Sequence, residues 1–534
     1  MKVVIIGGVA AGASAAARLR RLDETAEIVL FERGEHISYA NCGLPYHVGG
    51  VIQDREDLLV MSEAGFHKRF CVDVRTDCEV VKINRMAKNV HVRRSGEDYT
   101  ESYDCLIIAT GAEPIYVPIE GLPPAKTFTL TTLADMDRLI AALTPSVCSV
   151  AVVGGGFIGV EAAENLAHRG LSVTLVERNP HLLSANFDAE MAPWLERSLE
   201  QAGVTLALGH SVNSWQDGVA TLDNGAPVPA DIVLMCIGVR PRSTLARKAG
   251  LELGSRGHII VDENLRTSDP FIHAAGDVCE GKDPLTGHPS AIALAGPANR
   301  QGRAAAANVI GRPHLLHGTF GASVVKVGTW TGASIGLTEL RARAAGLNYR
   351  AIYAHPFDHA SYYPDSHPLH LKLLFDENFR ILGAQAIGQA GVEKRIDVIA
   401  TAMRFGATAC DLADLELCYA PPYGSAKDPV NILGMIASNI RDGLTTPITL
   451  DALPENAYLL DVREPSEFAT GTLPNAVNIP LGTLREHLDT LPYDRPIVVY
   501  CKVGQRGYFA ERILRQNGFS CVYNLTGGIT TWHP

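Results

Sequence analysis

Two cysteines of this chain stand where sulfur chemistry is favoured. Cys42 lies in ISYANCGLPYHVGG (37–50), before a Gly-Leu-Pro-Tyr run typical of a helix start. Backbone N–H groups and the helix dipole there would lower the pKa of the thiol and favour the thiolate. No Cys-x-x-Cys or Cys-x4-Cys pair surrounds it, and the next cysteine is Cys71. A redox role for Cys42 therefore requires a sulfenate or a mixed disulfide with a small external thiol; the alternative is an inert buried thiol.

The second cysteine, Cys501, is predicted to end a strand in IVVYCKVGQRGYFAERIL, with Arg506 close behind it at the start of a helix pattern. A loop this short can turn several N–H groups inward and form an anion cradle around one sulfur. Five further cysteines lie in strand-like or apolar stretches and are predicted to be structural: Cys71, Cys78, Cys105, Cys148 and Cys236.

A dinucleotide-binding turn is indicated in the stretch SVAVVGGGFIGVEAAENLAHRG. Gly154, Gly156 and Gly159 fit G-x-G-x-x-G between a strand and a helix, a spacing that lets a diphosphate approach the helix N-terminus. Glu177 ends the next strand, where a carboxylate accepts hydrogen bonds from a ribose diol and repels a 2′-phosphate. The pattern predicts an NADH site. Arg178 beside the acid slightly weakens the predicted preference for NADH over NADPH.

The N-terminus carries a second, imperfect copy of this turn. Gly7 and Gly12 fit the pattern, but Val9 stands at the middle position, with Gly8 one place early. Glu32 ends the following strand and is expected to hold an adenosine ribose. The alternatives are a βαβ unit without a ligand and a signal peptide; the glycines fall where a phosphate-binding turn needs them, which disfavours the latter.

The elements that must position these residues alternate between strand and helix patterns up to about residue 320, which predicts parallel sheets of the Rossmann type. Beyond residue 320, alternating polarity is typical of antiparallel strands. A stretch rich in Thr, Pro and Asp (441–457) looks like a linker, and a new α/β pattern follows it. We therefore expect an α/β protein of several domains.

The bulk composition excludes several classes of protein. With 534 residues the chain is too long for one core, and a net charge of −11 predicts no broad basic surface for nucleic acid. The 11 cysteines are scattered without a framework spacing, which indicates a reducing, cytoplasmic location. No apolar run is long enough for a membrane span, and we expect neither a membrane partner nor a metal site.

The segments IIATGAEP and HAAGDVCE, together with the two βαβ units, resemble the flavin-binding pattern of the two-dinucleotide flavoprotein reductases. The stretch SYANCGLPY-x-VGG resembles their single-cysteine branch, which holds NADH oxidases, NADH peroxidases and coenzyme A-disulfide reductases; GGVAAGAS is most similar to the last group. The resemblance covers residues 1–440 and implies FAD and NADH as cofactors. Residues implied in cofactor binding, besides the glycines and acids above, are Thr110, Gly111, Gly238, Gly276 and Asp277.

The resemblance also implies a homodimer whose active site is completed in trans. CYAPPYGSAKDPVN (418–431) is similar to the family segment that reaches the flavin of the other subunit, which makes Tyr423 a proton donor. Either Tyr362 or Tyr363 resembles the family's second tyrosine. Coenzyme A would be substrate or bound thiol, in a pocket implied to contain Arg18, Arg21, Ser38, Asn41, Lys68, Arg69, Asn299 and Arg303; by charge alone, such basic residues are more often solvated helix faces.

The C-terminal stretch LLDVREPSEFATGTLPNAVNIPL (459–481) and the Cys501–Arg506 spacing resemble rhodanese sulfurtransferases. The related phosphatase loop is one residue longer, which disfavours a phosphatase. The sequence departs from the usual Gly-His-Ile-Pro-Gly-Ala turn, with Gly-Thr-Leu-Pro-Asn-Ala at 471–476. The resemblance implies that Cys501 carries a persulfide with Arg506 in its anion cradle.

As a whole the chain resembles fusions of coenzyme A-disulfide reductase and rhodanese, the NADH-dependent persulfide reductases. The implied reaction reduces a persulfide, polysulfide or coenzyme A disulfide to thiol and sulfide, with Cys42 attacking the substrate. The rivals are an NADH oxidase or peroxidase with a Cys42 sulfenate, and a redox sensor or sulfur carrier.

The expected domains are an FAD-binding domain (1–112 and 244–318), an NADH-binding domain (113–243), an α+β dimerisation domain (319–440), a linker (441–452) and a rhodanese domain (453–534). The physiological acceptor, the docking of the rhodanese domain and direct sulfur transfer between Cys501 and Cys42 are left open.

Overall fold

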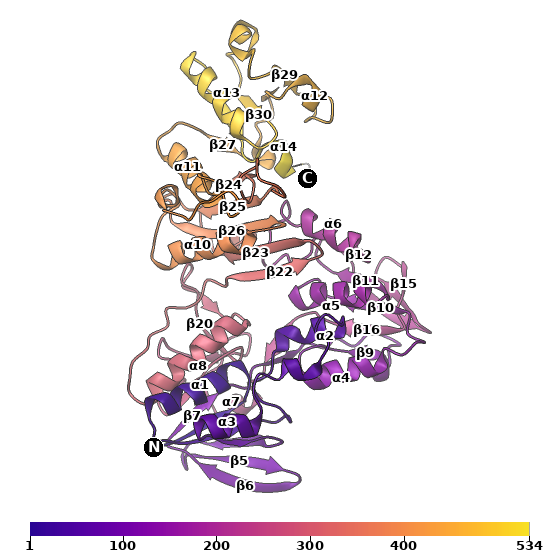
Figure 1. Cartoon of the computed structure of the whole chain (residues 1–534), viewed down its shortest axis with the longest axis vertical. Coiled ribbons are helices and arrows are strands. Elements are labelled where there is room, and N and C mark those ends of the chain that lie inside the picture. The colour runs from indigo at the N-terminus through magenta and orange to yellow at the C-terminus, as the bar shows by residue number, and fades with distance from the viewer. Residues whose placement is uncertain (533–534) are drawn as a thin grey trace. The chain divides into compact units, whose positions relative to one another are not determined.

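The computed structural model describes residues 1–532 and falls into two compact units. The first comprises Met1–Pro180 and Gly203–Gly321; the second comprises His181–Ala202 and the chain from Ala322 onward. Both are α/β (Figure 1), as the sequence predicts. Among the described residues, no helix combines the length and the apolar character that a membrane crossing requires.

The first unit contains two parallel five-stranded sheets. The N-terminal sheet has the order β19-β7-β1-β2-β3. Its strands are β1 (Lys2–Ile6), β2 (Glu27–Phe31), β3 (Asp73–Arg75), β7 (Cys105–Ile108) and β19 (Ile272–Ala274). Helix α1 (Ala10–Leu22) follows β1 and packs against α8 (Ala295–Val309). The two helices approach each other closely at Gly302, where a side chain would not fit. A Cβ on Gly302 would lie 2.1 Å from the carbonyl oxygen of Ala11.

The second sheet repeats this plan in the order β12-β11-β10-β16-β9. Its strands are β9 (Thr127–Phe128), β10 (Ser149–Val153), β11 (Ser172–Glu177), β12 (Val204–Leu208) and β16 (Ile232–Met235). Helix α5 (Phe157–His168) follows β10 as α1 follows β1. In both copies the last glycine of the turn lets the helix approach the strand end: a Cβ on Gly159 would lie 1.9 Å from the Gly154 carbonyl oxygen.

Smaller sheets complete the first unit; their strand pairs are antiparallel apart from one parallel pair, Ile259–Ile260 with Cys279–Lys282. They are β4-β5-β6 (Glu79–Asn84, Asn89–Arg94, Glu97–Ser102), β13-β14-β15 (Val212–Gln216, Val219–Leu222, Pro227–Pro229), β18-β20-β21 (Ile259–Ile260, Cys279–Lys282, Pro289–Ser290) and the pair β8-β17 (Ala112–Pro114, Val239–Pro241). The helices α2 (Leu44–Val48), α3 (Glu63–Phe70), α4 (Leu133–Ala142) and α7 (Thr244–Lys248) belong here too.

The second unit begins with an antiparallel sheet of order β22-β23-β26-β25-β24. Its strands are β22 (Ser323–Val327), β23 (Trp330–Gly336), β24 (Arg350–Ala354), β25 (His370–Phe375) and β26 (Ile381–Gly388), with helices α9 (Glu339–Ala344), α10 (Val392–Arg404) and α11 (Pro429–Arg441). Helix α6 (Pro193–Gln201) packs on β22 and β23. Residues 181–202, which the expected NADH-binding range of 113–243 includes, therefore pack with this sheet, and their apolar side chains are buried here.

The C-terminal sheet is parallel, with the order β27-β31-β30-β28-β29. Its strands are β27 (Pro447–Ile448), β28 (Tyr458–Asp461), β29 (Val477–Asn478), β30 (Ile497–Tyr500) and β31 (Val522–Leu525), with helices α12 (Pro465–Phe468), α13 (Gln505–Gln516) and α14 (Gly528–Trp532). Because β27 pairs with β31, the expected linker 441–452 is wrong over this strand, which belongs to the C-terminal sheet.

Candidate functional site

Glu32, the acid that follows β2, is hydrogen-bonded to the N-terminal turn. Gly7, with φ of 103°, turns the chain between β1 and α1. The Glu32 carboxylate accepts hydrogen bonds from the N–H groups of Gly8 and Gly34, both at 2.8 Å. Each oxygen keeps a lone pair that could accept from a ribose hydroxyl. The imperfect glycine spacing thus still forms the expected strand–turn–helix geometry.

The second turn has the same arrangement. The Glu177 carboxylate accepts a hydrogen bond from the Gly155 N–H at 2.6 Å and from the Asn179 N–H at 2.7 Å. A Cβ on Gly156 would meet no atom within 4 Å, so this glycine borders open space at the start of α5. Open space, free helix-end N–H groups and a placed acid fit a dinucleotide diphosphate and ribose.

The other implied cofactor residues lie at strand ends. Asp277 follows β19, and burial raises the pKa of its carboxyl. The Gly276 N–H donates to Gln301 Oε1 at 2.7 Å, and Gly276 has the left-handed φ of 84°. Gly111, also left-handed, has open space where a Cβ would stand. These features fit a cofactor that approaches the backbone closely.

Two of the implied cofactor residues have structural work of their own. The Thr110 hydroxyl donates to the carbonyl oxygen of Arg242 at 2.8 Å. Gly238, with φ of 109°, accepts a hydrogen bond from the Ile115 N–H at 2.9 Å. Both hydrogen bonds therefore stabilise the antiparallel pair of β8 and β17. Contact with a cofactor would be a second role of these residues.

Cys42 lies in a single 3-10 turn (Asn41–Gly43) that runs into α2. The helix start is as expected, but the pKa prediction is wrong. The atoms packed around the sulfur desolvate a thiolate, and Glu161 and Asp277 add negative charge, so the pKa of the Cys42 thiol is raised. Its side chain is exposed nonetheless, and all 11 cysteines are free, as expected for a cysteine whose redox partner is external.

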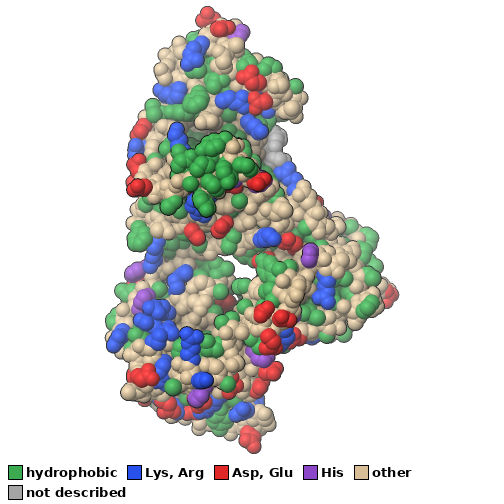
Figure 2. Space-filling view, viewed as in Figure 1, with side chains coloured by type: hydrophobic (Ala, Val, Ile, Leu, Met, Phe, Trp, Pro, Cys, Tyr) green, Lys and Arg blue, Asp and Glu red, His purple; other side chains and the backbone are tan. Residues whose placement is uncertain are grey.

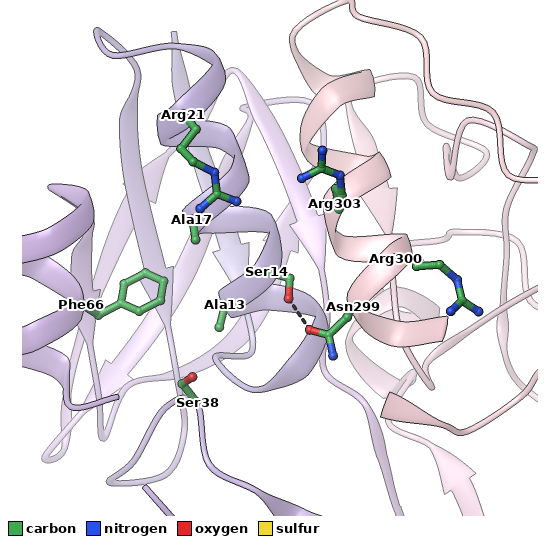
Figure 3. Close-up of a pocket in the computed structure, with 9 residues that line it drawn as sticks. All are labelled: Ala13, Ser14, Ala17, Arg21, Ser38, Phe66, Asn299, Arg300 and Arg303. Carbon is green, nitrogen blue, oxygen red and sulfur yellow. Dashed lines mark hydrogen bonds between the residues drawn. The ribbon is translucent and has the colours of Figure 1, made fainter. Parts of the chain in front are cut away.

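A pocket of about 400 Å³ opens between α1, α3 and α8 (Figure 3). It is lined by Ala13, Ser14, Ala17, Arg21, Ser38, Phe66, Asn299, Arg300 and Arg303. Four of the residues implied for coenzyme A are among them: Arg21, Ser38, Asn299 and Arg303. The others, Arg18, Asn41, Lys68 and Arg69, do not line it. Asn299 is anchored to Ser14 by a short hydrogen bond, and Ser38 stands four residues before Cys42.

The pocket carries an excess of positive charge. Burial and the nearby guanidinium groups of Arg303, Arg21 and Arg312 lower the pKa of Arg18. Its Nε is buried with no hydrogen-bond partner among the described residues. Clustered, incompletely paired arginines favour an anionic ligand. Sequence reasoning missed Arg300 and Arg312. Helical spacing along α8 could have found Arg300, because it lies three residues before Arg303, which also lines the pocket.

The tyrosines expected to act in trans are exposed on the second unit. Tyr423 is 72% exposed and Tyr362 is 74% exposed. The Tyr362 and Tyr419 hydroxyls are hydrogen-bonded at 2.9 Å, whereas the ring of Tyr363 packs edge-on against His359. Tyr419 was missed, although it lies in the segment that the sequence singles out. Figure 2 shows a hydrophobic patch over this part of the molecule, near β24 and α11.

Cys501 directly follows β30 and is fully buried. Its sulfur accepts a hydrogen bond from the Gly504 N–H at 3.2 Å, where Gly504 adopts a left-handed φ of 90°. Arg506, in the first turn of α13, holds Glu467 through two bonds of 2.7 Å and interacts electrostatically with Cys501. The loop thus brings an N–H and a guanidinium to one sulfur. Its spacing predicts several inward N–H groups, and the Gly504 N–H is one of them.

The unusual turn at 471–476 is integrated into this module. Arg463 forms a buried ion pair with Asp461 at 2.7 Å and also donates to the Gly471 carbonyl oxygen at 2.6 Å. The Tyr500 hydroxyl is bonded to Thr472 at 2.5 Å. The expectation for the remaining cysteines is wrong at two positions: Cys71 and Cys148 are exposed rather than packed in strands.

These features define a two-dinucleotide oxidoreductase joined to a rhodanese-like module. Family models agree: pyridine nucleotide-disulphide oxidoreductase over residues 1–302, its dimerisation domain over 322–429, and a rhodanese-like domain over 446–534. The chain belongs to the pyridine nucleotide-disulphide oxidoreductase family.

Particular relatives match over most or all of the chain. The chain is 33% identical over 438 residues to coenzyme A disulfide reductase of Staphylococcus aureus (strain JH9), covering 81% of this chain and 99% of the relative. A crystal structure of reduced Bacillus anthracis CoADR-RHD matches with a TM-score of 0.97 at 44% identity, over 99% of this chain and 97% of that one. A NAD-dependent persulfide reductase from A. fulgidus matches with a TM-score of 0.93 at 39% identity, over 100% of both chains. The resemblance inferred from the sequence is confirmed.

Proposed function

We propose that this protein is an FAD-dependent reductase that uses NADH to reduce persulfides, polysulfides or coenzyme A disulfides, with a C-terminal sulfurtransferase module. The observation that carries the proposal is Cys42: an exposed, unpaired thiol four residues from a pocket lined with arginines. The names of the coenzyme A disulfide reductase and the persulfide reductase among the relatives support it.

The pocket supports coenzyme A as the thiol carrier. Its volume falls within the range of small-molecule sites, and guanidinium groups from α1 and α8 suit the phosphates of a nucleotide thiol. Phe66 offers an apolar wall from α3. A substrate held there would extend past Ser38 toward Cys42, which places its sulfur-bearing end near the protein thiol.

In the proposed reaction, residues of this chain have three roles: nucleophilic attack, proton donation and transfer of sulfane sulfur. The Cys42 thiolate attacks the thiol-side sulfur of a persulfide, the S–S bond breaks, hydrosulfide leaves, and a Cys42–thiol disulfide forms. Bound FAD would supply the two electrons of NADH to that disulfide. As the disulfide is cleaved, Cys42 returns to the thiolate and Tyr423, contributed by a second subunit, donates one proton to the departing thiol. The Cys501 module loads or unloads sulfane sulfur.

A direct test compares two cysteine variants of the holoprotein under anaerobic conditions. Cys42→Ser should lose at least about a hundredfold of persulfide-dependent NADH oxidation and sulfide release, while keeping sulfurtransfer. Cys501→Ser should show the reverse. Cys521→Ser, which changes an exposed cysteine on the same module, serves as control. Equal loss of both activities in Cys42→Ser would refute the division of labour, and NADH oxidation that needs oxygen or peroxide instead would indicate the oxidase or peroxidase.

A further inference from the structure

Residues 526–532, which we call the docking segment, lie between the Cys501 loop and the antiparallel sheet of the second unit. The segment begins directly after β31 and includes α14. On the side of the loop, the Ile529 N–H donates to the Cys501 carbonyl oxygen at 2.9 Å, and the Thr530 N–H donates to the Lys502 carbonyl oxygen at 3.0 Å. The backbone around the sulfur is therefore hydrogen-bonded to this segment.

The other side of the docking segment contacts the end of strand β24. The Tyr353 N–H donates to the Thr526 hydroxyl at 3.1 Å, and His355 Nε2 lies 2.7 Å from the Thr531 hydroxyl. All four side chains are buried. A Cβ on Gly527 would lie 2.7 Å from the Cβ of Tyr353, so no further side chain fits between the segment and the strand. The sheet thus holds the docking segment near both of its ends.

His355 is in turn fixed by its neighbours on the sheet. Its Nδ1 lies 2.8 Å from Nδ1 of His370 on β25, and both rings are buried. The His370 ring stacks on the indole ring of Trp194 on α6, with 4.1 Å between the ring centres. The Thr531 hydroxyl is therefore bonded to an imidazole whose orientation is set by the packing of the sheet.

The hydrogen bonds from the docking segment set the direction of the peptide groups in the loop. In a trans peptide, the carbonyl of one residue and the N–H of the next point in opposite directions. The carbonyls of Cys501 and Lys502 point to the docking segment, so the N–H groups of Lys502 and Val503 point away from it. Among the described residues, neither of these N–H groups has a hydrogen-bond acceptor. Both are thus free for an anion in the loop.

We propose that His355 and Thr531 are positioning residues for sulfur transfer at Cys501. Their hydrogen bond fixes the docking segment on the sheet, and the docking segment aims the N–H groups of the loop at the anionic sulfur that Cys501 carries. The inference rests on the proposed role of Cys501 and deepens it, because it assigns the part of the antiparallel sheet on which that role depends.

Two substitutions of Thr531 separate the hydrogen bond from packing. Thr531→Val keeps the volume and removes the hydroxyl, whereas Thr531→Ser keeps the hydroxyl and removes a methyl group. The full-length holoprotein is assayed with thiosulfate, which leaves one sulfur on the Cys501 thiolate and departs as sulfite, and with cyanide, which removes that sulfur as thiocyanate. The kcat of thiocyanate formation should fall about tenfold in Thr531→Val and stay within about twofold of the wild type in Thr531→Ser. A packing role predicts the opposite order, because only serine leaves a cavity.

Further variants test the partner and the neighbouring position. His355→Leu should lower the kcat as Thr531→Val does, and the double variant should lose no more, because both changes break one bond. Thr530→Val is the matched control: its hydroxyl takes no part in these contacts, and its kcat should stay near that of the wild type. Far-UV circular dichroism verifies the fold of each variant.

Three results would overturn the inference. They are an unchanged kcat in folded Thr531→Val, a loss in Thr531→Ser as large as that in Thr531→Val, and an equal loss in Thr530→Val. Failure of the proposed function would appear elsewhere, as undiminished thiocyanate formation in Cys501→Ser.

Discussion

Arg506 and Glu467 are joined by two parallel hydrogen bonds of 2.7 Å each, from α13 to α12 of the C-terminal module. The Arg506 guanidinium lowers the pKa of Glu467 to about 2, so the carboxylate stays ionised at neutral pH. A bidentate pair of this kind fixes a guanidinium in orientation as well as in position. Glu467 thus orients the cation that faces the Cys501 sulfur.

Loss of this pair is expected to impair sulfurtransfer alone. Glu467→Gln removes the charge and one of the two bonds, so Arg506 gains freedom, and the rate of sulfur transfer through Cys501 should fall about tenfold. The measurement is thiocyanate or persulfide formation from a sulfane sulfur donor. NADH-dependent reduction in the same preparation is the control; its equal loss would indicate that Glu467 supports the fold rather than the loop.

Subunit mixing tests completion of the active site in trans. Tyr423 is largely exposed in one chain, which suits a residue that serves a partner. Homodimers of Cys42→Ser and of Tyr423→Phe should both be weak, but a mixed dimer should recover about half of the wild-type activity per dimer, because one site then contains both native residues. The comparison uses two affinity tags to purify the mixed species. No recovery above the homodimers would place Tyr423 in the site of its own chain.

The acid after β11 is expected to set the cofactor preference. Glu177→Ser removes a carboxylate that can bind a ribose diol, so the KM for NADH should rise about tenfold or more. NADPH should be used better than by the wild type, since repulsion of the 2′-phosphate is relieved and Arg178 is adjacent. Steady-state kinetics with both nucleotides checks this, with sulfurtransfer through Cys501 as the test of a native fold. An unchanged ratio of the two KM values contradicts the assignment.

The arginine pocket is expected to recognise phosphate. Arg303→Ala should raise the KM for coenzyme A persulfide about tenfold and leave the KM for glutathione persulfide, which has no phosphate, nearly unchanged. Lys68→Ala is the matched control, because Lys68 is basic, exposed and does not line the pocket. If both substrates suffer equally, the pocket does not read the nucleotide part of the substrate.

Two buried histidines predict a loss of stability in mild acid. His355 and His370 are hydrogen-bonded through their Nδ1 atoms at 2.8 Å, and His355 Nε2 lies 2.7 Å from the Thr531 hydroxyl. Burial lowers the pKa of His355 to about 3 and that of His370 to about 4. Both stay neutral when folded but bind protons when unfolded below about pH 6.5.

The free energy of unfolding of the second unit should therefore be highest above pH 6.5 and fall as the pH drops toward 4. The slope is at most about 1.4 kcal/mol per pH unit for each histidine. Urea unfolding followed by tryptophan fluorescence at pH 7.5 and 5.5 measures it, and His355→Asn should flatten the dependence. A midpoint that does not change with pH in the native protein would contradict this account.

Sequence alone was sufficient where function depends on local spacing. The glycines of both turns, Glu32 and Glu177 at strand ends, and the short loop from Cys501 to Arg506 were all predicted, because turn geometry and helix starts are properties of a few consecutive residues. The order of the domains followed from the same local patterns.

The tertiary structure decided everything that depends on partners far along the chain. It brings α8 beside α1, so that Arg300 joins the pocket. It also surrounds the Cys42 sulfur with other atoms, which raises the pKa of the thiol, and the charges of Glu161 and Asp277 raise it further. It also packs residues 181–202 against the antiparallel sheet of the second unit. The burial of a group and the electrostatic field at it depend on atoms that are distant in the sequence and come together only on folding. The periodicity of one segment therefore cannot predict them.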